Sequence, residues 1–336
     1  METGKHVVLV DFNAPEDWSF IEALEIVTKK KWEIVSCVNN RLHGGVIKKL
    51  RRYVMYFWLP LKILFDKNLY IQIIAWQQFY GLILAFYLRL FHVKNAPEIT
   101  VMTFIYKSKK GITGKLYFSF MRSAVQSGYV KKFVVFSKSE PSYYADLFDV
   151  SESYFQSEVL GIDDTAKDYE DNIVDNKLYL SAGRSNRDYD FLREAWEKAD
   201  CKLEIICDEE KRSNTENISY LTNCHGQQYM QRLAHSYAVV IPLLDEKISS
   251  GQLVILQSLM LGKPVIVTKN STVGDYIKDG FNGLIIDKTE QALLDAVFKL
   301  SVGGYYENIS KNARRSYEEN FSIYAMGLRI GKYFKE

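Results

Sequence analysis

Residues 249–287, SSGQLVILQSLMLGKPVIVTKNSTVGDYIKDGFNGLIID, contain the alternation that decides the fold. Apolar residues recur with helical spacing over 251–261 and then form a nearly unbroken run over 264–270. Gly262 separates the two patterns, and Gly283 opens a further short apolar run. The stretch therefore predicts a helix between two strands, which is the repeating unit of a parallel sheet.

The same alternation extends outward through the second half of the chain. Apolar runs predict strands at 177–183, 202–208, 218–223, 238–244, 264–270 and 283–287. Helical spacing predicts helices near 189–198, 229–235, 251–261, 290–300 and 305–319. We also expect Gly274 and Asp275 to open a helix, and Gly280 and Gly283 to form a turn.

The first half repeats this organisation. Strands are predicted at 7–12, 33–38, 71–76, 98–104 and 133–137, and helices near 20–29, 81–91 and 116–126. The polar stretch 163–177 interrupts the pattern and indicates a linker. We predict an α/β protein of two Rossmann-like domains facing across a cleft, at 1–165 and 166–319, with a tail at 320–336 that packs back on the first.

Composition narrows the classes of function. The chain has 336 residues, 47% of them apolar, which is enough for two cores, and its net charge of +2 gives no case for a nucleic-acid partner. Its four cysteines form no CxxC pair and have no spacing to histidine typical of zinc sites. An apolar strand follows the first residues directly, with no signal peptide between them. We expect a cytoplasmic protein with reduced thiols and no metal or other cofactor.

The start of the helix near 251 is suited to a phosphate. Ser250, Gly251 and Gln252 precede or begin this helix, whose first N–H groups lack partners inside it. Leu253 is then expected in the core. The alternative from spacing alone is an ordinary turn between helix and strand.

Two segments resemble a known family. LQSLMLGKPVI (256–266) and GDYIKDGFNGL (274–284) are similar to the C-terminal domain of retaining, GT-B-fold glycosyltransferases of group 1, or family 4. LSAGRSNRDYDFLREAW (180–196) looks like that family's first strand and phosphate-contacting loop. The resemblance covers the last half of the chain, and the first half is similar only in architecture. It implies transfer from a nucleotide sugar, with UDP as the expected nucleotide.

The family's paired glutamates fall on Ser249 and Gln257. Gln257 can still donate and accept hydrogen bonds at a ribose, but Ser249 supplies no carboxylate. Glu246 is the nearest candidate for the missing acid. Besides an active variant of the family, two alternatives stay open: a non-catalytic nucleotide- or glycan-binding module, and a sugar-nucleotide epimerase of the same fold.

The resemblance also assigns the other donor-side residues. Arg184 is the leading ligand for the diphosphate and Arg187 the second, because a guanidinium group can donate two parallel hydrogen bonds to phosphate oxygens. Their alternatives are a surface ion pair for Arg184 and pairing with the adjacent Asp188 for Arg187. The remaining donor-side candidates are Gly183, Cys207, Asp208, His225, Gly226 and Asp275. For His225 a solvated loop position is the alternative, and for Asp275 a simple helix-start carboxylate.

Strand ends in the first half supply acceptor-side candidates. Asp11, Asn13 and Glu16 follow the first predicted strand, and Trp76, Gln77 and Gln78 follow the third. Ligands of such sheets bind beyond the carboxyl ends of the strands. No general base is required of them if the leaving phosphate takes the acceptor's proton.

Residues 41–65 are basic and aromatic, with no acidic residue. Cations beside aromatic rings are typical of a helix at an anionic membrane interface. The candidates for membrane contact are Arg41, Lys48, Lys49, Arg51, Arg52 and Trp58. Pro60 and the charges argue against a transmembrane span. We expect peripheral attachment at the inner face of the cell membrane and a lipid-linked or membrane-held glycan acceptor, and the alternative is an amphipathic helix of the core.

Overall fold

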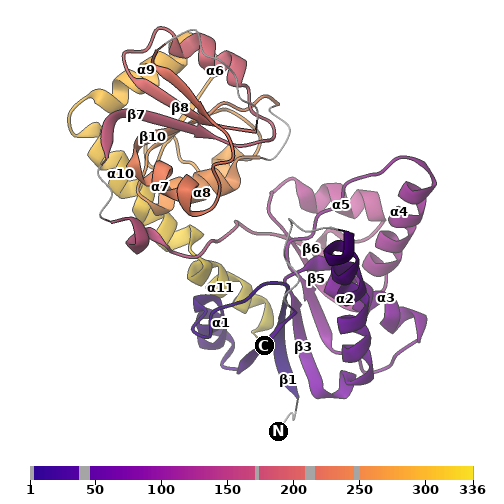
Figure 1. Cartoon of the computed structure of the whole chain (residues 1–336). Helices are drawn as coiled ribbons and strands as arrows, with labels where there is room; N and C mark the ends of the chain where they lie inside the picture. Colours follow the sequence, from indigo (N-terminus) through magenta and orange to yellow (C-terminus); the bar gives the residue numbers. More distant parts are fainter. Residues whose placement is uncertain (1–3, 38–45, 171–173, 209–215, 246–249, 336) are drawn as a thin grey trace. The chain divides into compact units, whose positions relative to one another are not determined.

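The computed structural model describes residues 4–37, 46–170, 174–208, 216–245 and 250–335, with every side chain in these ranges except those of 46–50, 52 and 176. The chain divides into two compact units. The N-terminal unit comprises Met1–Glu158 and Gly327–Glu336, and the C-terminal unit comprises Val159–Met326 (Figure 1). The last residues of the chain thus belong to the unit in which it starts.

The N-terminal unit is built on a parallel sheet of order β2-β1-β3-β4-β5-β6. Its strands are β1 (Lys5–Val10), β2 (Trp32–Ser36), β3 (Tyr70–Ala75), β4 (Glu98–Val101), β5 (Val130–Val135) and β6 (Phe155–Ser157). The middle strands are apolar on both faces, as a sheet covered on both sides requires.

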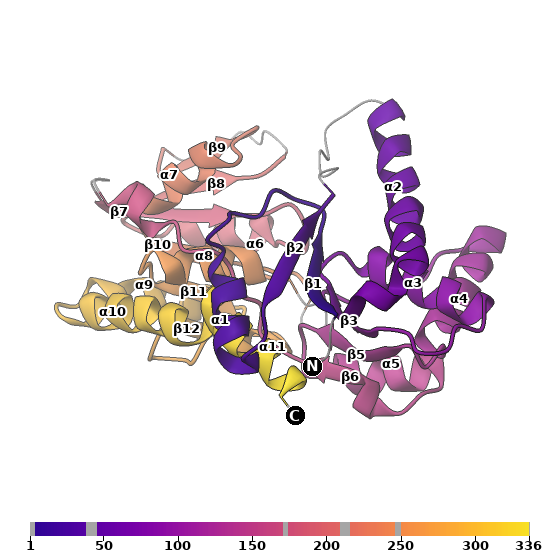
Figure 2. The ribbon, with the colours of Figure 1, turned by 90° about the horizontal axis from the view of Figure 1, so that it is seen from below.

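Helices cover both faces of this sheet. They are α1 (Ser19–Thr28), α2 (Val46–Phe65), α3 (Gln78–Leu90), α4 (Gly111–Val125) and α5 (Glu140–Phe148). Helices α2, α3 and α4 pack in a row on one face, whereas α1 and the end of α11 (Ile323–Gly331) lie on the other (Figure 2). Gly327 lets α11 approach α1, since a Cβ there would lie 2.7 Å from the carbonyl oxygen of Phe20.

The C-terminal unit contains a second parallel sheet, of order β12-β11-β10-β7-β8-β9. Its strands are β7 (Asp175–Ala182), β8 (Lys202–Ile206), β9 (Ile218–Leu221), β10 (Ser236–Ile241), β11 (Val265–Thr268) and β12 (Leu284–Ile286). Its helices are α6 (Tyr189–Trp196), α7 (Gln227–His235), α8 (Gln252–Met260), α9 (Glu290–Ser301) and α10 (Tyr305–Ser316). Two apolar clusters, one on each face of the sheet, form its core. The strand order reverses at β7, which lies between β10 and β8.

The predicted strands and helices are confirmed, with several differences. Helices α5 and α11 and strand β6 are not among the predictions; β6 has three residues, of which only Phe155 is buried. The prediction of a helix at Gly274 is wrong, since Val273–Asp275 forms a single 3-10 turn. Of the predicted linker 163–177, Asp164 pairs with Arg314 of the C-terminal unit, and the last residues already belong to β7.

Several candidate residues lie outside the described residues. Ser249, Glu246 and Arg41 are among them, and so are the side chains of Lys48, Lys49 and Arg52. Of the helices that the structure describes, none combines the length and apolar character needed to cross a membrane.

Candidate functional site

A cavity of about 340 Å³ opens at the carboxyl ends of β7 and β8. Helices α7 and α8 close it with Tyr229, Met230, Leu253, Val254 and Gln257. A second cavity of about 410 Å³ shares Gly183, Arg184, Cys207 and Asp208 with the first. Both lie where the strand order reverses, which is the usual ligand position in open α/β sheets.

Arg187 is a partly buried cation beside these cavities. Its Nε donates to the carbonyl of Ala182 at 3.1 Å and its Nη1 to the carbonyl of Ser185 at 3.0 Å. Burial lowers the pKa of its guanidinium. No carboxylate within the described ranges pairs with Arg187, and its Nη2 donates to none of their residues. A partly desolvated charge without an ionic partner is less stable than a solvated one, so this arrangement is suited to an anionic ligand.

Two glycines leave space for the guanidinium group of Arg187. Gly183 has φ +135°, and a Cβ there would lie 2.7 Å from Nη2 of Arg187. Gly251 has φ +86° as the N-cap of α8, and a Cβ there would lie 3.5 Å from the same nitrogen. The guanidinium therefore lies against the helix N-terminus, where free N–H groups and the helix dipole favour a phosphate.

Asn186 holds the loop before α8, and it was not predicted. Its Nδ2 donates to Oγ of Ser250 at 2.9 Å, and its Oδ1 accepts from the backbone N–H of Asp245 at 2.8 Å. Asn186 has φ +55°, a left-handed conformation that asparagine tolerates better than most residues. Asn186 thus ties the β7–α6 loop, from which both arginines project, to Asp245 and to Ser250 before α8.

Arg184 contacts two of the predicted donor-side residues. Its Nε lies 2.9 Å from Oδ1 of Asp208, and its Nη2 lies 2.9 Å from Nε2 of His225. A guanidinium only donates, so the imidazole nitrogen facing it accepts. The ion pair that was the alternative for Arg184 is present, but both partners are about half exposed and line the cavity.

The alternative for Arg187, pairing with the adjacent Asp188, is wrong. Asp188 pairs instead with Lys288 at 3.2 Å and caps α6 through the N–H of Phe191. The expectation that Leu253 is in the core is also wrong, since its side chain is 54% exposed at the cavity. Helix α8 begins at the site, so the outward side of its first turn faces the cavity rather than the sheet.

Most donor-side candidates meet at this edge of the sheet. Those that line the two cavities are Gly183, Arg184, Arg187, Cys207, Asp208, His225, Gly226 and Gln257. Ser250, Gly251 and Gln252 form the adjacent start of α8. Asp275 lines neither cavity and ends the 3-10 turn after β11.

Two tyrosines of the site were not predicted. Tyr229 lines the smaller cavity, and its buried hydroxyl has no hydrogen-bond partner among the residues of the described ranges. Tyr189 donates to the carbonyl of Gly183 at 2.7 Å and so fixes the end of β7. Burial raises the pKa of both phenols, so they stay neutral hydrogen-bonding groups. In the sequence, each is simply an aromatic near a helix start.

The acceptor-side candidates are only partly brought together. Nε2 of Gln77 lies 3.3 Å from Oδ2 of Asp11, which is 9% exposed, and 3.3 Å from the hydroxyl of Tyr56 on α2. Asn13 and Glu16 are exposed in the loop after β1.

Trp76 and Gln78 have structural contacts. The ring of Trp76 packs 5.0 Å from those of Trp18 and Phe20, and Oε1 of Gln78 accepts the N–H of Ile105. Asp11 and Gln77 therefore remain the acceptor-side pair that lies at the carboxyl ends of neighbouring strands.

Helix α2 has one buried and one exposed side. Tyr56, Leu59 and Ile63 pack in the core against α3. Phe57 and Trp58 are 52% and 50% exposed, and Nζ of Lys62 lies 5.9 Å from the Trp58 ring. Arg51 is exposed near the start of the helix. The helix is amphipathic, as the alternative supposed, and its free side is aromatic and basic.

No metal-binding group of three or more His, Cys, Asp or Glu side chains occurs in the part of the chain that the structure describes. The prediction of a metal-independent site stays a prediction.

Comparison with known proteins agrees with this geometry. Residues 177–301 match the family model described as "Glycosyl transferases group 1", and no curated protein matches the chain. A glycosyltransferase from Rickettsia africae has 15% identity and a TM-score of 0.62, with 98% of each chain covered. Anabaena HepE in complex with UDP has 11% identity and a TM-score of 0.62, with 98% of this chain and 99% of the other covered.

A third solved structure extends the comparison. WaaG, a glycosyltransferase involved in lipopolysaccharide biosynthesis, has 12% identity and a TM-score of 0.56, and 98% of this chain and 99% of that chain are covered. At these identities the likeness is one of fold. The chain accordingly has the GT-B fold of glycosyltransferases, and its C-terminal unit carries a region that matches the group 1 glycosyl transferases.

Proposed function

We propose that this chain is a glycosyltransferase that moves a sugar from a UDP-sugar to a lipid-linked or membrane-held glycan acceptor. The observation that carries the proposal is Arg187, a partly buried guanidinium beside the N-terminus of α8 with no carboxylate partner among the described residues. Such a group is suited to a diphosphate, which is the leaving group of a nucleotide sugar.

The cavity beside the diphosphate position fits a nucleoside. Leu253, Val254 and Met230 offer apolar surface to a base, while Gln257 offers an amide to the ribose. HepE, which shares the fold, was solved with UDP, and this supports uridine as the nucleoside.

Transfer requires stabilisation of the departing UDP. In the proposed mechanism, Arg187 and the N–H groups at the start of α8 bind the diphosphate, and Arg184 adds a second cation. Negative charge on the diphosphate grows as the glycosidic bond breaks, so these donors stabilise the transition state more than the ground state. We further propose retention of the anomeric configuration, with a phosphate oxygen taking the acceptor's proton and with no metal required.

The acceptor belongs to the N-terminal unit in this proposal. Asp11 and Gln77 form its polar contact, and α2 offers Phe57 and Trp58 to the interface of an anionic membrane. A lipid-linked glycan is an acceptor that such a surface retains. WaaG acts in lipopolysaccharide biosynthesis and shares the fold, which supports a cell-surface glycan as product and peripheral attachment at the inner face of the membrane.

A reaction assay tests the activity. Purified protein is incubated with UDP-glucose, UDP-galactose and UDP-N-acetylglucosamine in the presence of lipid-linked glycan acceptors, and released UDP and the product's anomeric signals are measured. We expect UDP release that depends on the acceptor, with an anomer matching the donor. Release of no UDP from any donor, with UDP still bound, would instead indicate the non-catalytic module, because Ser249 and Gln257 stand where the family has glutamates. Conversion of the donor without acceptor would indicate an epimerase.

A further inference from the structure

A larger cavity, of about 890 Å³, lies at the opposite edge of the C-terminal sheet. The beginnings of β7 and β10 form one side of it, and α9 and the first turn of α10 form the other. The donor site lies at the carboxyl ends of the same strands, so the two sites are separated by the length of the sheet. The transfer reaction proposed above makes no use of this cavity.

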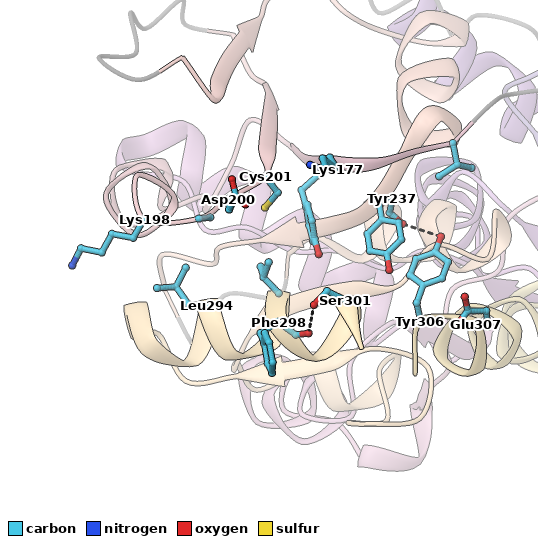
Figure 3. Close-up of a pocket in the computed structure, with 14 residues that line it drawn as sticks. Lys177, Lys198, Asp200, Cys201, Tyr237, Leu294, Phe298, Ser301, Tyr306 and Glu307 are labelled. Atoms are coloured by element: carbon cyan, nitrogen blue, oxygen red, sulfur yellow. Dashed lines mark hydrogen bonds between the residues drawn. The ribbon is translucent and has the colours of Figure 1, made fainter. Parts of the chain in front are cut away.

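Stacked tyrosines form a rigid wall of the cavity. The ring centroids of Tyr237 and Tyr306 lie 4.0 Å apart and the rings are nearly parallel; Leu294 and Ser301 of α9 line the same cavity (Figure 3). The Tyr237 hydroxyl donates to the carbonyl of Leu300 at 2.7 Å, and the Tyr306 hydroxyl donates to the carbonyl of Tyr237 at 3.1 Å. Because both hydroxyls are anchored, the rings keep their positions when a ligand binds.

A third tyrosine supplies an unused polar group. Tyr179 is 3% exposed and lines the cavity, and its ring lies 5.7 Å from that of Tyr237. Its hydroxyl makes no hydrogen bond with any residue for which the structure gives a side chain. A ligand that donates to this hydroxyl or accepts from it therefore adds a hydrogen bond inside the cavity.

The charges around the cavity disfavour an anionic ligand. Lys198 is paired with Glu290 at 2.7 Å, and the other charged residues that line the cavity are Lys177, Asp200 and Glu307, one cation and two carboxylates. Polar groups inside are neutral at physiological pH, since burial raises the pKa of Cys201 to about 12. A phosphate therefore meets no surplus of positive charge there, in contrast to the donor site.

We propose that this cavity binds a neutral oligosaccharide. A sugar ring has an apolar face and hydroxyl edges, and this matches a wall of tyrosine rings and Val297 with a free hydroxyl at its base. The site holds a glycan chain away from the donor pocket and so extends the proposed function from transfer to retention of a glycan. Binding of the glycan at this cavity depends neither on the sugar that the donor carries nor on catalysis.

Binding measurements on the full chain test the proposal. The probes are neutral oligosaccharides of two to six residues, on an array and then in calorimetry, with phosphorylated and carboxylated oligosaccharides beside them. We expect neutral probes to bind. Tyr179→Phe, which removes one hydroxyl, weakens the binding about three- to tenfold. Val297→Trp fills the cavity and abolishes binding, whereas Gln291→Trp on the same helix leaves it unchanged.

The same variants separate this site from the donor site. Tyr179→Phe and Val297→Trp are expected to keep the wild-type stabilisation by UDP, which also shows that they fold. Three results overturn the proposal: no neutral probe binds, only anionic probes bind, or Val297→Trp and Tyr179→Phe bind as the wild type does. None of these results affects UDP binding, so the failure of this proposal is distinguishable from failure of the proposed transfer function.

Discussion

Two arginines three residues apart have different environments. Arg187 is partly buried and donates to backbone carbonyls, whereas Arg184 is about half exposed and bonded to Asp208 and His225. Arg187 is already partly desolvated, so its hydrogen bond to a diphosphate is worth more than one made by a solvated side chain. We therefore assign the larger share of diphosphate binding to Arg187 and a positioning and charge-balancing share to Arg184.

The contribution of Arg184 to diphosphate binding is testable by substitution. Arg184→Ala is expected to lower kcat/KM for sugar transfer about tenfold to 100-fold, the cost of one charge-assisted contact of about 1.5–3 kcal/mol. The measurement is UDP release at varied donor concentration. Arg193→Ala, on the outer part of α6 with Asp190 and Glu194 as partners, serves as the control. Normal turnover by Arg184→Ala contradicts the assigned role.

Ionisation of Lys263 in the C-terminal unit makes the free energy of unfolding depend on pH. Its side chain is 5% exposed, and burial lowers its pKa from 10.5 to about 8. Between pH 8 and 10.5 the unfolded chain holds this proton and the folded chain does not, so the free energy of unfolding rises with pH in that window. Below pH 8 the protein carries the full penalty, which is about 3 kcal/mol from a shift of that size.

Lys263→Met removes this penalty. We expect the variant to unfold at higher denaturant than the wild type at pH 7, with the difference shrinking from pH 8 towards pH 10.5. Chemical denaturation at several pH values measures it. Lys311→Met removes an exposed lysine that lines one cavity together with Lys263, and it should show no such trend. A constant difference at all pH values contradicts the assignment to Lys263.

At the scale of elements, α2 combines two tasks. Its inner side completes the core with Leu59 and Ile63, and its outer side leaves Phe57 and Trp58 exposed. Twenty residues rise about 30 Å along a helix, so both sides are long. Pro60 lies inside α2 without ending it, although proline normally removes one hydrogen bond of a helix.

The two sides of α2 predict opposite phenotypes. Phe57→Ser with Trp58→Ser is expected to abolish sedimentation with vesicles rich in anionic phospholipid at low salt, with little change in stability. Leu59→Ala is expected to keep vesicle binding and to lose about 2–5 kcal/mol of stability through the cavity it creates. Equal sedimentation of the double variant and the wild type contradicts the membrane role.

The sequence predicts elements better than it predicts their exposed sides. Long apolar runs such as those of β7 and β10 predict strands clearly. Strand β6 has only one buried residue, which is too few to form a recognisable pattern. Strand ends and the resemblance predicted Arg184, Asp208 and His225, which the structure brings together at one cavity. The partial burial of Arg187 and the free hydroxyl of Tyr229 were not predictable, because both depend on packing between α7, α8 and the β7–α6 loop.

At the scale of the whole molecule, each unit carries its own sheet and its own candidate site. Donor-side groups belong to the C-terminal unit, and the acceptor-side pair and α2 belong to the N-terminal unit. The C-terminal residues Gly327–Glu336 return to the N-terminal unit, where Arg329 pairs with Glu158 at 2.8 Å. The chain therefore passes between the units twice, at 158–159 and at 326–327.

The central claim is that the C-terminal unit binds the diphosphate of UDP through Arg187. Calorimetric titration of UDP into wild type, Arg187→Met and Arg315→Met tests it most directly, since Arg315 is an exposed arginine of the same unit paired with Glu319. We predict that wild type and Arg315→Met bind UDP alike and that Arg187→Met binds it about 100-fold more weakly. Equal affinity in all three proteins, or no UDP binding by the wild type, would contradict the account.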